Sequence, residues 1–238
     1  MLLQINGLTK EYQRGGIPFS AVNNVILSVS PGDFICITGR SGSGKSTLLN
    51  LIAGLLKPTS GSITIEGRDT STFNDEEASL YRNSKIGYIP QGQSVLANLT
   101  VLDNVRLPFY LFRHEGDSMA KAMSLLEQVG IRHLAHMYPR QLSGGELRRV
   151  SIARALINDP MMIIADEPTG DLDEQTTAEI MRLFRLISHK GMAVLLVTHD
   201  MNAAHAGNRF FIMDSGVLTE QRGRDRGGRR AGGRGEYT

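Results

Sequence analysis

The sequence predicts an α/β fold: a parallel α/β core with an N-terminal antiparallel β subdomain and an inserted helical subdomain. Three observations predict it. Short β-branched or apolar runs recur, and an amphipathic helical pattern separates two of the later ones, as in a parallel β-α-β unit. The first ~70 residues instead join their apolar runs through Gly and Pro turns, with a single intervening helix. Residues from about 92 to 157 carry helical patterns without strand patterns.

Eight runs are predicted to be strands: residues 2–5, 22–29, 34–38, 62–65, 86–89, 161–165, 193–197 and 210–213. Two apolar stripes at helical spacing predict amphipathic helices. The first stripe consists of Met119, Ala122, Met123, Leu126 and Val129, and the second of Ile180, Leu183, Phe184 and Ile187. The single cysteine, Cys36, lies in an apolar run, so we expect a small core residue there and no intrachain disulfide framework.

Composition narrows the class of protein. Hydrophobic residues make up 41% and charged residues 21% of 238, as in ordinary globular domains. Residues 222–238 hold six arginines against two acidic residues, a local charge of +4, so the net +2 leaves about −2 for the rest. The body is therefore not expected to bind nucleic acid, and this Arg/Gly-rich tail is expected to be disordered. No targeting signal and no run of ~20 apolar residues is present, so we expect any membrane role to need a partner chain.

The segment from Gly39 to Thr47 fits the phosphate-loop pattern G-x-x-x-x-G-K-[ST]. It follows a predicted strand and precedes an apolar helix expected over residues 48–55. Glycines let the backbone approach phosphate oxygens, and the helix N-terminus adds partial positive charge. Lys45 is expected to reach the β- and γ-phosphates, and the Ser46 hydroxyl to bind Mg²⁺. This predicts a P-loop NTPase (RecA-like) core that holds ATP with Gly39, Arg40, Ser41, Gly42, Ser43, Gly44, Lys45, Ser46 and Thr47.

Two carboxylates follow the predicted strand 161–165. The carboxyl ends of parallel strands are where such folds bind ligands, so both are expected to face the phosphate loop. Asp166 is expected to hold Mg²⁺, directly or through water, and Glu167 to act as general base on the attacking water. An acidic pair after a strand is more often the start of a loop, and it indicates a site here because of the phosphate loop.

The pentapeptide from Leu142 to Glu146 reads Leu-Ser-Gly-Gly-Glu and resembles the signature motif of ABC transporter ATPases. The order of motifs resembles that family over about residues 1–219. Ser143 is expected to cap a helix that runs to Leu156, which makes a second anion-type site; a capping serine without a ligand is the alternative. The resemblance implies that two copies sandwich two ATP molecules, each contacted by the partner's signature residues: Ser143, Gly144, Gly145 and Glu146.

The resemblance assigns four further residues. Gln91 is similar to the glutamine that contacts Mg²⁺ and water and links the core to the insert. His199 is similar to the switch histidine at the γ-phosphate, and Asp173 lies in a segment, Asp-Leu-Asp, that resembles the D-loop. Tyr12 is similar to the aromatic residue that stacks on adenine; an ordinary strand-edge tyrosine is the alternative. The chain departs from the family pattern after the signature, where Leu147-Arg148-Arg149 stands in place of the usual polar pair.

Within that family the chain is most similar to the LolD-like and MacB-like group of lipoprotein-release and macrolide-export ATPases. This implies an ATP-binding domain over residues 1–221 and a separate permease partner at the cytoplasmic face of the inner or plasma membrane. The expected cargo is lipoprotein, peptide, drug or haem, and its choice lies with the permease. FtsE-like ATPases, which signal to a cell-wall enzyme instead of transporting, are the alternative.

A dense apolar run from Leu107 to Phe112 follows the predicted glutamine loop. A helix buries only one face, and this run holds more large apolar side chains than one face accommodates. We expect part of it, with Leu96 and Leu99, to line a groove for a short helix of the permease.

Overall fold

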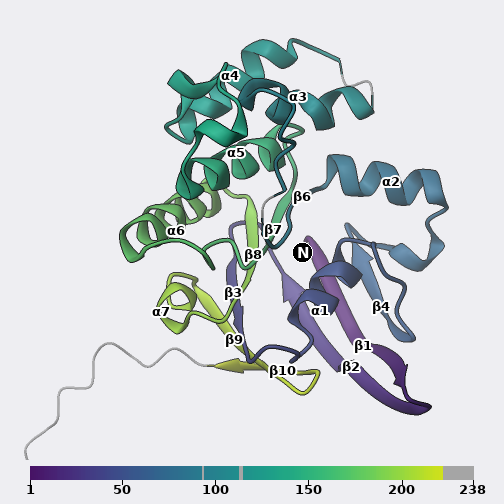
Figure 1. The fold of residues 1–238 in the computed structure, drawn as a ribbon. Helices are drawn as coiled ribbons and strands as arrows, with labels where there is room; N and C mark the ends of the chain where they lie inside the picture. Colours follow the sequence, from purple (N-terminus) through teal and green to yellow (C-terminus); the bar gives the residue numbers. More distant parts are fainter. Residues whose placement is uncertain (93, 113–114, 222–238) are drawn as a thin grey trace, which may run out of the picture.

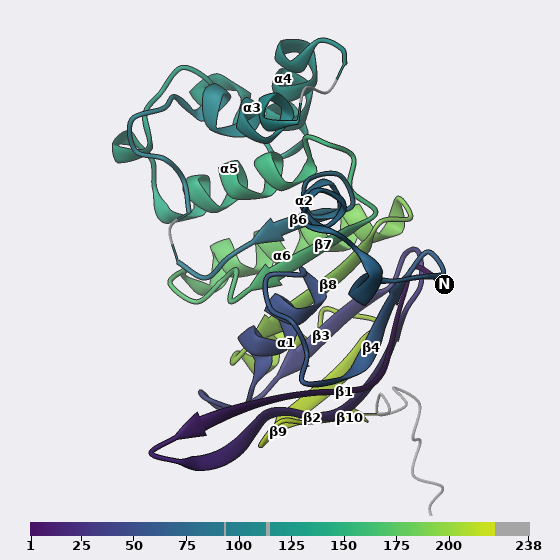
Figure 2. The same ribbon diagram turned by 90° about the vertical axis from the view of Figure 1, so that its right-hand side faces the viewer.

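The computed structural model describes residues 1–92, 94–112 and 115–221. It has two sheets and a helical layer above them (Figures 1 and 2). The predicted tail, residues 222–238, lies outside the described residues. None of the described helices is both long enough and apolar enough to cross a bilayer.

The front sheet has the strand order β2-β1-β4-β5 and is antiparallel. Its strands are β1 (Leu3–Arg14), β2 (Ile17–Val29), β4 (Ser60–Ile65) and β5 (Arg68–Asp69). The predicted strands covered only the buried end of the β1–β2 hairpin, because residues 11–19 at its tip are exposed and show no apolar alternation. The predicted antiparallel subdomain is confirmed, with a longer hairpin.

The central sheet has the order β10-β9-β3-β8-β7-β6. Its strands are β3 (Phe34–Thr38), β6 (Ile86–Ile89), β7 (Met162–Asp166), β8 (Ala193–Thr198), β9 (Arg209–Asp214) and β10 (Val217–Gln221). All neighbours pair in parallel except β9 and β10. The predicted parallel core is therefore confirmed. The sequence did not predict β10, which is mostly exposed.

The two faces of the central sheet belong to different cores. Ile35 and Ile37 of β3 face helix α1 (Lys45–Ile52) and the front sheet. Cys36 points to the other face, into the core formed with α6 (Glu174–His189) and the helical insert. This alternation is the period of two expected of a strand buried on both faces. It confirms Cys36 as a core residue.

Two predictions about helices need correction: the bounds of the first helix and the burial of Met119. Helix α1 begins at Lys45, inside the phosphate loop, and ends at Ile52, so Leu55 lies beyond it with 51% of its surface exposed. Met119 was placed in the first buried stripe but is 43% exposed. The remaining members of both stripes are buried or pack against the core. A further helix, α2 (Asp75–Ser84), has Tyr81 as its only buried residue, which is why no apolar stripe predicted it.

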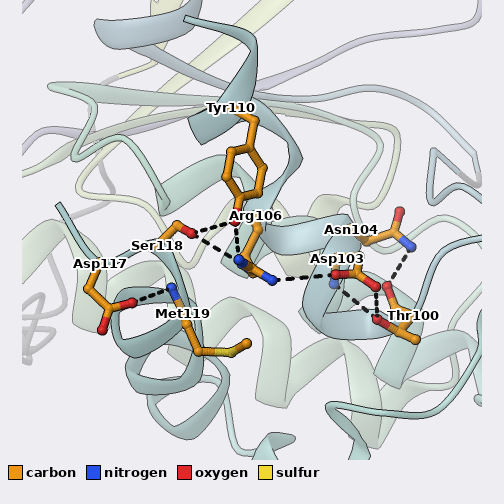
Figure 3. Close-up of polar contacts among 8 residues, drawn as sticks. All are labelled: Thr100, Asp103, Asn104, Arg106, Tyr110, Asp117, Ser118 and Met119. Carbon is orange, nitrogen blue, oxygen red and sulfur yellow. Dashed lines mark hydrogen bonds and ion pairs between the residues drawn. The ribbon is translucent and has the colours of Figure 1, made fainter. Parts of the chain in front are cut away.

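The helical insert consists of α3 (Val101–Leu111), α4 (Ser118–Gln128) and α5 (Gly144–Leu156), with short 3₁₀ turns at Arg132–Leu134 and Pro139–Gln141. No described residue between β6 and β7 is in a strand, as predicted. Figure 3 shows how α3 and α4 are joined: the Arg106 guanidinium donates to Ser118 Oγ at 3.2 Å and to the Tyr110 hydroxyl. Thr100 caps α3 by accepting from Asp103 N. The short helix α7 (Met201–Ala204) and a 3₁₀ turn at Thr70–Thr72 complete the fold.

Candidate nucleotide site

A pocket of about 400 Å³ lies at the carboxyl end of the central sheet. It is formed where β3 turns into α1 and where the ends of β7 and β8 approach that turn, so segments far apart in the sequence meet. The lining residues are Tyr12, Phe19, Ala21, Ser41, Gly42, Ser43, Gly44, Lys45, Ser46, Thr47, Gln91, Glu167 and His199. Most of the predicted phosphate-loop residues are thus brought together with Gln91, Glu167 and His199.

Two glycines of the loop are required by packing inside the protein. A Cβ on Gly39 would lie 2.2 Å from the carbonyl oxygen of Met213 on β9. Gly44 has a φ of 106°, and a Cβ there would lie 2.0 Å from the carbonyl oxygen of Ala21 on β2. The neighbouring strands thus require glycine at both positions, in addition to the predicted approach of phosphate. Neither Gly39 nor Arg40 lines the pocket directly.

Inside the loop, the Lys45 ammonium donates to the carbonyl oxygens of Gly39 (2.8 Å) and Arg40 (3.1 Å), and Lys45 is 8% exposed. These hydrogen bonds hold the buried Lys45 ammonium within the loop. Gly39 and Arg40 therefore contribute to the site through their carbonyl oxygens, although neither residue lines the pocket. The Ser43 hydroxyl is buried and has no hydrogen-bond partner in the described part of the chain. A buried hydroxyl without a partner costs free energy, so the loop retains unused capacity to bind a ligand.

Asp166 lies at the end of β7 with 4% of its surface exposed. Burial is the largest influence on the pKa of its carboxyl and raises it; the neighbouring charge of Glu167 raises it further, while the Ser46 hydroxyl and Lys45 lower it. Asp166 Oδ1 is buried without a partner. An orphaned carboxylate oxygen beside a serine hydroxyl is a donor set that suits Mg²⁺, which takes few protein ligands and keeps several waters. The residues present therefore fit this cation.

Glu167 and His199 form a pair at the pocket wall. Glu167 Oε2 accepts from the backbone N–H of His199 (3.2 Å) and lies 2.9 Å from His199 Nδ1. The Glu167 backbone is left-handed, with a φ of 48°, and its N–H donates to the Val197 carbonyl at 3.0 Å. A non-glycine residue in this region costs ~1–3 kcal/mol and is typical of functional sites. The strained turn thus places the Glu167 carboxylate in the pocket wall, beside His199 at the end of β8.

An aromatic pair forms the far wall of the pocket. Tyr12 and Phe19 are cross-strand partners in the β1–β2 hairpin. Their rings stack with centroids 5.9 Å apart and planes at 29°, and they are 36% and 47% exposed. Tyr12 was predicted to stack on adenine, but Phe19 was not predicted. Phe19 becomes a neighbour of Tyr12 only through the register of the hairpin. Flat exposed rings beside a phosphate loop suit a nucleotide base.

The remaining predicted residues lie elsewhere. Ser143 caps α5: Glu146 N donates to Ser143 Oγ at 3.4 Å, and Ser143 N donates to Glu146 Oε2 at 2.7 Å. Asp173 caps α6 by accepting from Thr176 N at 2.9 Å. The predicted cap at Ser143 is present and the cap at Asp173 was not predicted; none of Ser143, Gly144, Gly145, Glu146 and Asp173 lines the pocket. The two anion-type segments of one chain do not meet in a single site.

The fold and this pocket define a P-loop nucleotide-binding domain, and comparisons give its family. The family model described as ABC transporter matches residues 22–170. The chain belongs to this family and is an ATP-binding cassette, the ATPase domain of such transporters.

Similar proteins agree with that placement. The macrolide export ATP-binding/permease protein MacB of Chlorobaculum tepidum is 38% identical over 221 residues, which is 93% of this chain and 34% of that protein. The probable syringafactin export ATP-binding/permease protein SyfD of Pseudomonas syringae pv. syringae is 41% identical over 228 residues, 94% of this chain and 35% of that protein. The chain thus spans about a third of the length of these curated relatives.

Two solved structures similar to this fold are of the cassette MJ0796. One is its dimeric structure, at 38% identity and a TM-score of 0.84 over 93% of this chain and 100% of that chain. The other is its dimeric post-hydrolysis state bound to ADP and Pi, at 38% identity and a TM-score of 0.85 over 94% of this chain and 99% of that one. Both are structures of ATP-binding cassettes, and it is the MacB and SyfD relatives that agree with the predicted group of export ATPases.

Proposed function

We propose that two copies of this chain close around two ATP molecules and hydrolyse them to drive a separate permease that exports or extracts its cargo. The observation that carries the proposal is the separation of the phosphate pocket from the signature segment. None of Ser143 to Glu146 lines the pocket of its own chain, and in the proposed dimer these residues of the second copy donate to the γ-phosphate. ATP then adds contacts that exist only in the closed dimer, so it biases a two-state interface.

The residue roles follow the chemistry of the pocket. Residues 39–47 bind the phosphates, with Lys45 turning from its loop carbonyls to the β- and γ-phosphates. Asp166 and Ser46 would hold Mg²⁺, with Gln91 beside them, and the bound ion would neutralise phosphate charge. Glu167 accepts a proton from the attacking water while His199 orients it. In the proposed dimer, Ser143 to Glu146 of the second copy contact the γ-phosphate, and Asp173 lies at the interface between the two copies.

The ATP-binding domain is assigned to residues 1–221 and its helical insert to about 92–157. The permease and its membrane are inferred from relatives that are named ATP-binding/permease export proteins. The proposed location of this chain is the cytoplasmic face of the inner or plasma membrane, reached through the permease. These relatives do not favour the FtsE-like regulatory alternative.

Lys45→Ala tests the nucleotide site. Removing the buried ammonium leaves the phosphates without their closest cation, so we expect binding of a fluorescent ATP analogue to fall at least about tenfold and turnover to stop. Lys57→Ala is the matched control, because this lysine is exposed and lies outside the pocket. Unchanged affinity and turnover in Lys45→Ala would show that the loop has only a structural role.

The permease contact is proposed at the end of α3. The apolar run divides there: Phe109 is 6% exposed and belongs to the core, whereas Tyr110 and Leu111 are 54% and 66% exposed, and Leu96 is 46% exposed. Leu111→Ser is therefore expected to keep the fold and basal ATPase activity yet lose co-purification with the permease. Phe109→Ser is expected to unfold the insert. Normal co-purification of Leu111→Ser would place the contact elsewhere.

A further inference from the structure

The side chain of Arg148 is a buried cation that the site described above does not use. Arg148 lies on α5 one turn beyond the signature glycines and is 8% exposed. Its Nη1 atom is buried and has no hydrogen-bond partner among the residues that the structure describes. Burial without a partner is unfavourable for any charged group. The sequence therefore retains a destabilising group here.

The other two arginines of this helix differ from Arg148. Arg149 donates to the Val129 carbonyl at 2.9 Å and to Glu179 Oε2 at 2.7 Å. Arg154 donates at 2.7 Å to both the carbonyl and the hydroxyl of Ser94. Both tie the helix to neighbouring segments. The missing partner of Nη1 is thus specific to Arg148 and is not a general property of arginines on α5.

The face of α5 that carries Arg148 packs on the first turn of α6 and on the segment just before it. A Cβ on Gly144 would lie 3.3 Å from Leu172 Cδ2, and a Cβ on Gly145 would lie 2.6 Å from Thr176 Cγ2. Residues three and four apart share a helix face, so Arg148 follows Gly144 and Gly145 along that same contact. The signature and the segment from Asp171 to Asp173 are therefore in direct contact within one chain.

The negative charge that acts on Arg148 is that of Asp171. Burial is the larger influence on the pKa of Arg148 and lowers it, and the Asp171 carboxylate raises it. Asp171 is exposed, and the two side chains form no ion pair within the described ranges. A cation and an anion are thus within electrostatic reach across the contact without being joined.

We infer that Arg148 is a positioning residue that pairs with Asp171 when two cassettes close around ATP, fixing the signature helix to the segment that begins α6. The inference rests on the proposed ATP-sandwich dimer. In that dimer the signature serves the partner's ATP, so the pair transmits its position to the Asp171–Asp173 segment of the same chain. Closure also gives the buried guanidinium the partner it lacks, so the pair stabilises the closed state selectively.

Two measurements distinguish a positioning role of Arg148 from a merely structural one: the melting temperature of the monomer and the strength of the MgATP dimer. Loss of a merely structural arginine would lower both. Arg148→Met replaces an unpaired buried charge with an apolar side chain of similar length, which is neutral or stabilising when no pair is lost. We expect the melting temperature of the nucleotide-free variant to stay equal or rise. The same variant is expected to weaken the dimer that forms with MgATP.

The experiment measures dimer dissociation by analytical ultracentrifugation with MgATP, in a Glu167→Gln background that slows hydrolysis. Arg148→Met and Asp171→Asn are each expected to raise the dimer dissociation constant about tenfold, equivalent to ~1.4 kcal/mol. The double variant is expected to add little to either single one. Arg148→Lys is expected to recover part of the loss. ATP affinity of the monomer is expected to stay unchanged throughout.

Arg140→Met and Glu174→Gln are matched controls, since both side chains are exposed and lie near the same segments. If the Glu167→Gln parent does not dimerise with MgATP, the proposed function is wrong. If the parent dimerises and Arg148→Met dimerises equally well, the inference is overturned. If Arg148→Met does not fold, Asp171→Asn and Arg148→Lys decide, because unchanged dimers in both would overturn it.

Discussion

The phosphate loop and the signature are both Ser/Gly-rich segments that open a helix, yet their polar groups are satisfied in opposite ways. Around the phosphate loop, Ser43 Oγ and Asp166 Oδ1 are buried without partners. At the signature, Glu146 Oε2 accepts from Ser143 N at 2.7 Å and from Ser143 Oγ at 2.8 Å. The first segment is left open for a ligand, whereas the second is closed by its own carboxylate.

The pKa of Glu146 follows from that closure. Hydrogen bonds from the backbone and the hydroxyl of Ser143 lower it, so the carboxylate stays charged at neutral pH. An approaching γ-phosphate must therefore compete with an anion already at the helix end. In the proposed dimer, the pocket of one chain therefore takes ATP directly, whereas the signature of the other chain must exchange a contact with its own carboxylate for one with the nucleotide.

The largest expected effect is that of Glu167→Gln. The amide cannot accept the proton of the attacking water, and loss of a general base typically costs ~10²–10⁴-fold in turnover. The pocket is otherwise intact, so ATP still binds and the dimer accumulates. Size-exclusion chromatography with MgATP checks this. If the variant stayed monomeric with MgATP and turned over normally, both the general-base role of Glu167 and the proposed dimer would be wrong.

Ser143→Ala sharpens the comparison from the other side. Loss of an N-cap costs ~1 kcal/mol of stability, and the signature also loses a hydroxyl donor for phosphate. We expect the MgATP dimer of the Glu167→Gln background to weaken about tenfold, near ~1.4 kcal/mol, while monomer ATP affinity is unchanged. Asn74→Ala removes the capping box of α2 and is the control for lost cap energy alone. Equal dimers in both variants would reduce Ser143 to a cap.

Phe19→Ala is expected to change only the nucleotide pocket, which Phe19 lines. Aromatic stacking is worth ~0.5–1.5 kcal/mol, so we expect ATP affinity to fall about two- to tenfold. Tripolyphosphate, which has no base, is expected to bind both forms equally. Ile17→Ala removes an exposed side chain from the same strand, outside the pocket, and serves as control. A matching loss of tripolyphosphate affinity would mean that the hairpin, not the ring, had changed.

The smallest expected effect is a rise in stability in Asp166→Asn. Because the folded-state pKa of Asp166 is raised, ionisation costs stability, which is intact below the unfolded pKa and lost as pH rises through the folded one. The variant should therefore melt higher at pH 7, by ~2–4 °C per kcal/mol, and gain less near pH 4. Calorimetry without Mg²⁺ checks it. A lower melting temperature at pH 7 would contradict the unfavourable burial of this carboxylate.

The sequence predicted what short-range patterns determine. The parallel core, the phosphate loop, the caps at Ser143 and the burial of Cys36 all follow from local spacing. It did not predict α2, whose capped, polar helix buries only Tyr81, or the exposed strand β10. The pairing of Phe19 with Tyr12 and the proximity of Arg148 to Asp171 were missed for a different reason. The first depends on the register of the hairpin and the second on how α5 packs against a segment distant in the sequence, and neither is visible in short-range patterns.

The left-handed backbone at Glu167 has a consequence for directed evolution. Glycine adopts a φ of 48° without strain, so Glu167→Gly relaxes the turn as it deletes the carboxylate. A laboratory screen that rewards heat resistance alone would therefore enrich inactive cassettes at this codon. Only a screen that also demands turnover would keep the glutamate, so the position records which trait a population was selected for.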